Sequence, residues 1–419
     1  MARFLFLCVI VGVVAGLGAT AFFLLLEFTR FIFLEQLAGF HPEGPGGEAP
    51  LFQHSDGALR PWVLFALPAV GGLVSGIIIY RYAPETAGHG TDAAIESYHF
   101  HDGRVRKRVP FIKAITAAIT IGTGGSAGRE GPIAQIGAGF AATLGNALGL
   151  TGHERRTLMA AGMAAGIGAI FHAPLAGALF AAEVLYKDMD LEHEVLIPAF
   201  ISSVTAYSIF CMFFGWEPIF VTPDFVFDHP IQLLPYGALA VTMALCASLY
   251  VYCFYGVHNR FEALRVPNYL KPAIGGVVVG LISLVAPRAL GAGYGIVQQA
   301  IDHELTVPVL LGLALCKIAT TSFSVGSGGS GGVFGPALVI GGAVGGVVGL
   351  TAEQVFPAAD IQAGAFVIVG MAGFFAAAAN TPISTIIMVS EMTGNFNLLV
   401  PSMLVCILAY LLARRFTLY

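Results

Sequence analysis

The sequence predicts an all-α protein that crosses a lipid bilayer several times. Of its 419 residues, 57% are hydrophobic and 11% are charged, whereas about a quarter of the residues in soluble domains carry a charge. The first apolar run, residues 4–26, contains no charged side chain. It exceeds the roughly 20 residues that a helix needs to span a bilayer, and it is too long for a signal peptide. Because only helices and closed barrels satisfy their backbone in lipid, the pattern predicts a polytopic helical membrane protein.

Further apolar runs follow along the whole chain. They cover residues 62–80, 195–215, 232–254, 272–287, 307–325, 333–356, 363–390 and 396–413. Basic residues gather at 104–108, 155–156 and 414–415, and the positive-inside tendency predicts that these segments face the cytoplasm. The polar stretch 41–60 is expected to face outward. The six cysteines lie in apolar runs and are expected to be reduced. The net charge of −5 is too small to indicate a nucleic acid or another charged partner.

The chain contains an internal duplication, a feature that decides the fold before any motif is considered. Four pairs of segments match in the same order: 67–76 with 271–280, 88–97 with 291–300, 124–132 with 328–336, and 162–184 with 370–392, with Lys113 matching Lys317. The offset between the two members of each pair is nearly constant. We therefore expect two structural repeats, one over about 60–220 and one over about 265–419.

Glycine-rich loops interrupt the apolar runs at equivalent points of the two repeats. The loops GGSAGREGP (124–132) and GGSGGVFGP (328–336) each end in a proline that suits the first turn of a helix. The N–H groups and the positive dipole end of an exposed helix N-terminus favour an anion. Duplicated, interrupted apolar segments point to the binding site of a transporter. Close helix packing through small residues is the alternative, and it is the better explanation for the many scattered glycines.

The motifs GREGP (128–132) and GGVFGP (331–336), with an upstream glycine-flanked loop, resemble the CLC family of chloride channels and proton-coupled chloride exchangers. The resemblance runs in order from about residue 10 to the C-terminus. It implies a multi-pass protein of the inner membrane and a homodimer with one anion pathway per subunit. It also implies two inverted-topology repeats, whose broken or tilted helices direct their N-termini at the anion. We expect one transmembrane domain over 1–419, without a cytoplasmic regulatory domain, a cofactor or a metal.

By position, Glu130 matches the gating glutamate of the family. Its carboxylate would occupy an anion site and swing away when it is protonated or displaced. A carboxylate is itself an anion that competes for the same helix N-termini, so proton and anion occupancy become linked. An acidic residue inside a membrane is a functional candidate by default; a satisfied ion pair between Glu130 and Arg129 is the alternative. Arg129 itself is expected to shape the potential or the loop rather than to contact the anion.

The loop GHGTD (88–92) departs from the family pattern Gly-Ser-Gly-Ile-Pro, because His89 replaces the serine that contacts the central anion. A histidine could donate an N–H group and would bind an anion better when protonated. It is also larger, which puts the usual choice of chloride in doubt. Alternatively, His89 points away and caps a helix or meets lipid headgroups. Asp92 is expected to be the N-cap of the next helix.

The resemblance also assigns the remaining anion-binding positions. The N–H groups of Val333 and Phe334 match the central anion donors, and Gly332 permits close approach. Tyr419, in LARRFTLY (412–419), resembles a tyrosine whose hydroxyl reaches the central ion from the inside; the alternative is a frayed terminal residue. The expected anion-binding set comprises His89, Gly90, Gly128, Arg129, Gly332, Val333, Phe334 and Tyr419.

A second departure lies at the inner end of the pathway. Exchangers of the family carry a glutamate after the APLAG motif that relays protons, and in HAPLAGALFAAEVLYKD (172–188) that position is Val184. Valine cannot carry a proton and resembles the channel branch, although some exchangers also lack the acid. The preceding Glu183 is a candidate substitute relay. Because Glu183 matches Glu391 in the other repeat, a structural role such as pairing with a helix end is the alternative.

These features predict transport of small monovalent anions, chloride first, with channel-like conduction favoured and proton-coupled exchange as the alternative. An enzyme is not expected. The segment GSGGSG (326–331) fits a dinucleotide-binding loop but lacks the βαβ context that this motif requires. The metal-binding motif H-E-x-x-H of hydrolases is missing from the sequence. A receptor or scaffold would not need duplicated pore loops.

Overall fold

The structure is a computed structural model that describes residues 2–52, 57–186, 190–357 and 361–418. Within these ranges it contains α-helices and no β-strand, which confirms the predicted all-α fold. The first half holds α1 (Ala2–Arg30), α2 (Pro61–Tyr82), α3 (Thr91–Phe100), α4 (Val109–Gly122), α5 (Glu130–Ala147), α6 (Gly152–Ile170), α7 (Pro174–Glu183) and α8 (His193–Phe214). The second half holds α9 (Leu233–Ala263), α10 (Lys271–Ser283), α11 (Tyr294–Ile301), α12 (Val307–Val325), α13 (Phe334–Val355), α14 (Ala363–Ala379), α15 (Pro382–Thr393) and α16 (Leu399–Ala413).

In the part of the chain that the structure describes, six helical stretches are long and apolar enough to cross a bilayer. They are Arg3–Leu37, Pro61–Tyr82, His193–Phe214, Pro230–Ala263, Val307–Val325 and Phe334–Val355. The apolar runs did not predict every helix boundary correctly. The run 272–287 contains the helix α10, which is only 13 residues long. The run 363–390 is split between α14 and α15, because Asn380 adopts a left-handed backbone with φ 56° and Pro382 starts a new helix.

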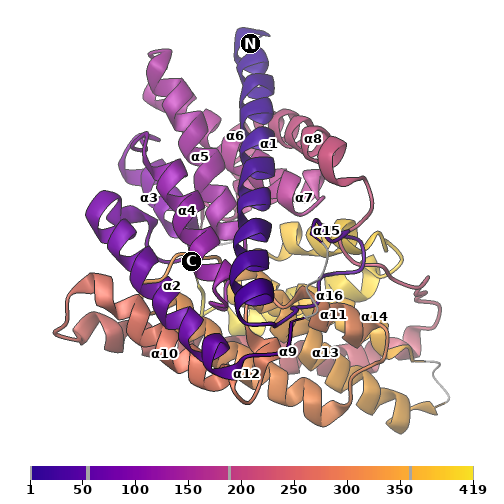
Figure 1. The fold of residues 1–419 in the computed structure, drawn as a ribbon. Coiled ribbons are helices and arrows are strands. Elements are labelled where there is room, and N and C mark those ends of the chain that lie inside the picture. Colours follow the sequence, from indigo (N-terminus) through magenta and orange to yellow (C-terminus); the bar gives the residue numbers. More distant parts are fainter. Residues whose placement is uncertain (1, 53–56, 187–189, 358–360, 419) are drawn as a thin grey trace.

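The two halves pack against each other in opposite orientations, as Figure 1 shows for α2 and α10, which lie side by side. A methyl group on Gly72 would lie 2.4 Å from the carbonyl oxygen of Pro272, and one on Gly276 would lie 2.2 Å from that of Pro68. Pro68 and Gly72 are the repeat counterparts of Pro272 and Gly276. This reciprocal contact between antiparallel helices is consistent with the predicted inverted repeats.

The centre of the protein is formed by helices that are buried on all sides. Every residue of α14 is buried, and α13 and α6 are buried over most of their length. Small residues allow this close packing: a methyl group on Gly341 or on Gly370 would lie 2.6 Å from the carbonyl oxygen of the other glycine. Helix packing therefore accounts for these glycines, as expected. All six cysteines are free.

Two buried lysines hold equivalent short turns in the two repeats. The Lys113 Nζ donates to the carbonyl oxygens of Thr86 (3.1 Å) and Gly88 (2.8 Å). The Lys317 Nζ donates to the carbonyl oxygens of Ala289 (3.2 Å) and Gly291 (2.6 Å). These carbonyl groups lie at the ends of 3-10 turns, Pro84–Thr86 and Pro287–Ala289, that lead into α3 and α11. The two lysines thereby hold the loops that precede α3 and α11 and so position the starts of these helices near the centre of the protein.

Candidate functional site

Three glycine-rich loops from different parts of the chain meet at the centre of the fold. Gly128 and Gly332 exchange two backbone hydrogen bonds, each of 2.7 Å. The N–H of Gly88 donates to the carbonyl of Gly329 (3.1 Å), and the N–H of Gly331 donates to that of Gly88 (3.2 Å). The loops of both repeats are therefore joined by main-chain hydrogen bonds, and the helices that follow them begin close together.

The helix N-termini at this junction surround a small cavity. It is lined by Thr91, Glu130, Gly131, Ala134, Ile167, Phe171, Phe180, Phe334 and Met388. Phe334 is the first residue of α13, and Val333 is its N-cap. Within the described ranges, the N–H groups of Val333 and Phe334 donate to no backbone carbonyl. Such N–H groups at a helix start are available to an anion.

The carboxylate of Glu130 lies at this junction, and the residue is 3% exposed. The Tyr294 hydroxyl donates a hydrogen bond to its Oε1, and the N–H of Gly335 donates to its Oε2 at 3.2 Å. A methyl group on Gly128 would lie 1.9 Å from the same Oε2, so this position has no room for a side chain. The carboxylate thus accepts from an N–H group in the first turn of α13, at the helix end that suits an anion.

Arg129 pairs with Glu48 and not with its neighbour Glu130. Its guanidinium forms an ion pair with Glu48, which includes an Nη1–Oε2 contact of 3.1 Å. It also lies over the rings of Phe23 and Tyr294, 5.1 and 5.3 Å from their centroids, a geometry typical of cation–π contacts. The alternative of an Arg129–Glu130 ion pair is therefore wrong. Arg129 thereby ties Glu48 to the start of α5.

His89 is 6% exposed, lies just before α3 and pairs with a residue in the first turn of that helix. Its Nε2 lies 2.8 Å from Oδ2 of Asp92, whose side chain is 54% exposed. The expectation that Asp92 is an N-cap is wrong, because Gly90 is the N-cap of α3 and Asp92 lies in the first turn. Gly90 takes this place because its φ of 90° suits a residue without a Cβ. The cavity beside Glu130 is lined by Thr91 and not by His89.

Glu183 and Glu391 bind the helix N-termini of each other's repeat. The Glu183 carboxylate accepts from the N–H groups of Ile383 (3.0 Å) and Ser384 (2.8 Å) and from the Ser384 hydroxyl (2.5 Å). The Glu391 carboxylate accepts from the N–H groups of Leu175 (3.2 Å) and Ala176 (2.8 Å). The pairing with a helix end that the duplication suggested is the arrangement found here. Val184, beside Glu183, is 4% exposed.

Sequence reasoning missed several side chains of this site. Thr91 and Tyr294 are repeat counterparts, and both lie at the start of a helix beside the junction. An aromatic cluster of Phe171, Phe180 and Phe375 surrounds Phe334, with ring centroids 4.6, 6.4 and 4.0 Å from that of Phe334. The matched segments 88–97 and 291–300 could have pointed to the first pair. No sequence pattern joins the phenylalanines.

The predicted inner tyrosine, Tyr419, lies outside the described residues. The residue before it, Leu418, is buried. Its N–H donates to the carbonyl of Ala378 (2.8 Å), and its carbonyl accepts from the Tyr255 hydroxyl (2.9 Å). Residue 418 is therefore bound against the end of α14.

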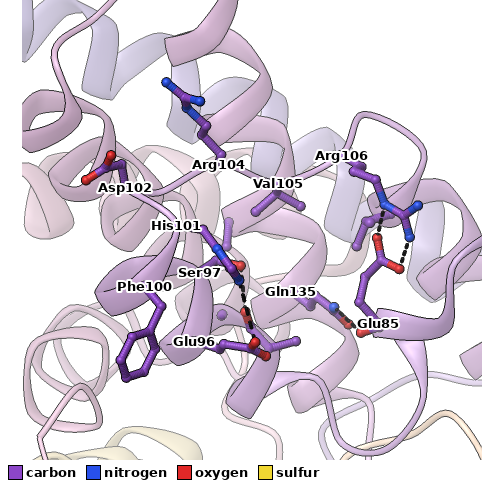
Figure 2. A pocket seen from close by; sticks show the side chains of 14 residues that line it. Glu85, Glu96, Ser97, Phe100, His101, Asp102, Arg104, Val105, Arg106 and Gln135 are labelled. Atoms are coloured by element: carbon purple, nitrogen blue, oxygen red, sulfur yellow. Dashed lines mark hydrogen bonds and ion pairs between the residues drawn. The ribbon is translucent and has the colours of Figure 1, made fainter.

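A larger hollow lies at the periphery, between α3, the α3–α4 connection and α5 (Figure 2). Arg106 pairs with Glu85 there, and His101 Nε2 lies 3.5 Å from Oε1 of Glu96. Gln135 Nε2 donates to the Glu85 carbonyl at 2.8 Å. These charged side chains pair with each other, and Glu130 does not line the hollow. The junction of the loops is therefore the better candidate site.

Comparisons with known proteins agree with this architecture. The family model described as voltage gated chloride channel matches residues 71–414. A putative ClcB-like chloride channel protein of Ralstonia nicotianae is 30% identical over 85% of this chain and 84% of its own length. The H(+)/Cl(−) exchange transporter ClcA of Klebsiella pneumoniae is 30% identical over 98% of this chain and 85% of its own length. A solved structure of a slow cyanobacterial Cl−/H+ antiporter matches with a TM-score of 0.84 and 23% identity, covering 99% of this chain and 94% of that one.

Proposed function

We propose that this chain, which belongs to the CLC family of voltage-gated chloride channels, transports small monovalent anions through a pathway gated by Glu130. Chloride is the first candidate. The observation that carries the proposal is the position of the Glu130 carboxylate, which accepts a hydrogen bond from a first-turn N–H group of α13. A mobile anion that takes this place must displace the carboxylate, because both need the same donor. Protonation would weaken the hold of the carboxylate and so favour entry of the anion.

The N–H groups of Val333 and Phe334 are proposed as the central anion donors, with Gly332 and Gly128 giving the close approach. Arg129, His89 and Gly90 are proposed to act by placing the loops around the anion rather than by contact. The ionisable groups that act on Glu130 are Arg129, Tyr294 and Lys317.

Passive conduction is our first proposal for the mode of transport. Val184 offers no proton, and the Glu183 carboxylate already accepts three hydrogen bonds from α15. Proton-coupled exchange is the second candidate. It is supported by the glutamate gate and by the relative from Klebsiella pneumoniae, whose name describes exchange of protons for chloride. Residence in the inner membrane as a homodimer belongs to the same proposal.

The test is proton movement in liposomes. Purified protein is reconstituted with a steep chloride gradient under a clamped voltage, and chloride and pH are followed together. Chloride flux without proton flux would support a passive pathway, whereas uphill proton movement would support exchange. Flux of another anion in place of chloride would mean that chloride is not the substrate and that the other anion is. No anion flux at all would contradict the proposal.

The variant Glu130→Gln tests the gate in the same vesicles. The amide cannot take up or release a proton, so transport should lose its pH dependence, either by losing proton coupling or by staying open. The matched control is Glu194→Gln, because Glu194 is exposed and forms a surface pair with His153 at 3.1 Å. If Glu130→Gln keeps the pH dependence of the unmodified protein, Glu130 is not the gate.

A further inference from the structure

We propose that Tyr294 is the positioning residue of the gate: its hydroxyl holds the Glu130 carboxylate at the junction of the two repeats, and the carboxylate must leave this hydroxyl whenever the pathway opens. The inference rests on the proposed function, since it assigns a partner to the proposed gating glutamate. It concerns a residue that no motif in the sequence singled out.

The contact joins a donor from one repeat to an acceptor from the other. Tyr294 is 4% exposed, begins α11, and donates its hydroxyl proton to Oε1 of Glu130. An ionised carboxylate can only accept hydrogen bonds, and a bond to a charged acceptor is stronger than a neutral one. The N–H of Gly335 holds the other oxygen, Oε2, at 3.2 Å. Each carboxylate oxygen thus has its own donor, one from α11 and one from α13.

The tyrosine ring is itself held in place from both sides. The Arg129 guanidinium lies 5.3 Å from the ring centroid, and the Phe220 ring packs edge-on at 5.8 Å. Arg129 is fixed in turn by its ion pair with Glu48. The hydroxyl is therefore aimed at Glu130 by neighbours that do not touch the carboxylate.

Gly335 leaves the space that the contact needs. A methyl group on Gly335 would lie 2.9 Å from the Tyr294 hydroxyl oxygen and 3.0 Å from Oε1 of Glu130. Either the tyrosine or the carboxylate would have to shift. The same position supplies the N–H donor for Oε2, so a glycine here serves both halves of the contact.

The contact is not a requirement of the duplicated scaffold. The repeat counterparts of Tyr294 and Glu130 are Thr91 and Phe334, which line the cavity together but carry no carboxylate. The scaffold thus accommodates this pair of positions without the hydrogen bond. The tyrosine–glutamate pair thus occurs at one of the two equivalent places in the duplicated fold. A gate on one side of a single pathway requires such an asymmetry.

The inference predicts that anions displace the carboxylate more easily when the hydroxyl is removed. Tyr294→Phe should lower the half-saturating chloride concentration roughly ten- to a hundredfold, the factor that one hydrogen bond to a charged group carries, while the maximal rate is kept or raised. The matched control is Tyr98→Phe, which also removes a tyrosine–carboxylate bond, from Tyr98 to Glu192 at 3.2 Å, away from the junction. It should leave the half-saturating concentration unchanged.

The experiment measures chloride efflux from liposomes over a range of chloride concentrations, with a chloride electrode. The same substitution is repeated in a Glu130→Ala background, where no carboxylate remains and the effect of Tyr294→Phe should fall below about twofold, since no bond is left to lose. A merely structural role would act equally in both backgrounds. If Tyr294→Phe does not fold, Gly335→Ala should shift the half-saturating concentration in the same direction.

The outcomes separate this inference from the proposed function. Flux that responds to Glu130→Gln but is the same in Tyr294→Phe and Tyr98→Phe would overturn the role of Tyr294 and leave the gate intact. An equal effect in the Glu130→Ala background would also overturn it. If the unmodified protein shows no anion flux, the proposed function is contradicted, and this inference is contradicted with it.

Discussion

The two repeats carry different residues where the pathway lies and the same residues where the loops and helices are held. At the junction, Glu130 of the first repeat corresponds to Phe334 of the second, and Tyr294 corresponds to Thr91. Away from the junction, a lysine, a glutamate and the packing glycines recur in both repeats with the same hydrogen bonds. Residues that are the same in both repeats therefore hold the fold. Residues that differ between the repeats are the ones to test for a role in transport.

The largest effect that would sharpen this comparison concerns Glu183 and Glu391. In Glu183→Gln and Glu391→Gln, an amide NH2 group would face the backbone N–H groups of α15 or α7. We expect each to lower the free energy of unfolding by about 2 kcal/mol, as measured by thermal unfolding in detergent, with Glu194→Gln as the exposed control. If both variants remain folded but Glu183→Gln alone abolishes proton movement, Glu183 is a proton relay. Glu183 and Glu391 would then not have the same structural role.

The buried lysines should give a smaller pair of effects that are similar to each other. After Lys113→Met, the Gly88 carbonyl still accepts from the Gly331 N–H at 3.2 Å, and the Thr86 carbonyl loses its donor. After Lys317→Met, the Ala289 carbonyl still accepts from the Thr320 hydroxyl at 3.3 Å, and the Gly291 carbonyl loses its donor. A buried carbonyl without a donor costs roughly 1–3 kcal/mol, so the two variants should lower the melting temperature by similar amounts. A clear difference between them would show that the two turns are not equivalent.

His89 is the next test, because its counterpart in the second repeat is Ala292 and the scaffold does not need a histidine there. If the imidazole contacts the anion instead of only placing the loop, His89→Ser should lower the anion affinity roughly few-fold. Asp92→Asn, which removes the carboxylate 2.8 Å from Nε2, is the companion variant. Identical affinity curves for His89→Ser and the unmodified protein would assign His89 to the scaffold.

The smallest effect concerns the starts of α6 and α14, which are capped differently. Thr151 and Glu154 form a capping box at α6, whereas the first N–H of α14 donates to Glu353 at 2.7 Å. Thr151→Ala should cost about 1 kcal/mol of stability. The Thr151 N–H and hydroxyl hold the pKa of the Glu154 carboxyl below its usual range. The stabilisation from this lowered pKa is therefore present above about pH 4.3, the usual glutamate value, and is lost as the pH falls further.

Thermal unfolding of Thr151→Ala and the unmodified protein between pH 3 and 7 measures this last prediction. The difference in melting temperature between them should shrink at the acid end, because Glu154 becomes protonated and its bonds to Thr151 weaken. A difference that is independent of pH would mean that the hydroxyl acts on the helix without Glu154.

The sequence was sufficient for the fold class, and it pointed to the glycine-rich loops of the candidate site, because both depend on patterns that repeat. Apolar runs and the four matched segments predicted helices, repeats and the meeting of the glycine loops. Side-chain partners over long sequence distances could not be predicted: Arg129 with Glu48, and Glu130 with Tyr294, are joined only by the fold. Asp92 was misplaced because the glycine before α3 adopts a positive φ, which a capping pattern does not reveal.

The reciprocal contacts of the repeats have a consequence for the origin and assembly of this chain. Glu183 caps α15 while Glu391 caps α7, and Gly72 meets Pro272 while Gly276 meets Pro68. Self-complementary contacts of this kind define an isologous interface, the type that joins identical subunits across a two-fold axis. The molecule is thus organised like a dimer of half-length proteins fused end to end. The carboxylate that caps α7 comes from the second half and the one that caps α15 comes from the first, so each half would need the other present to complete these two helix starts.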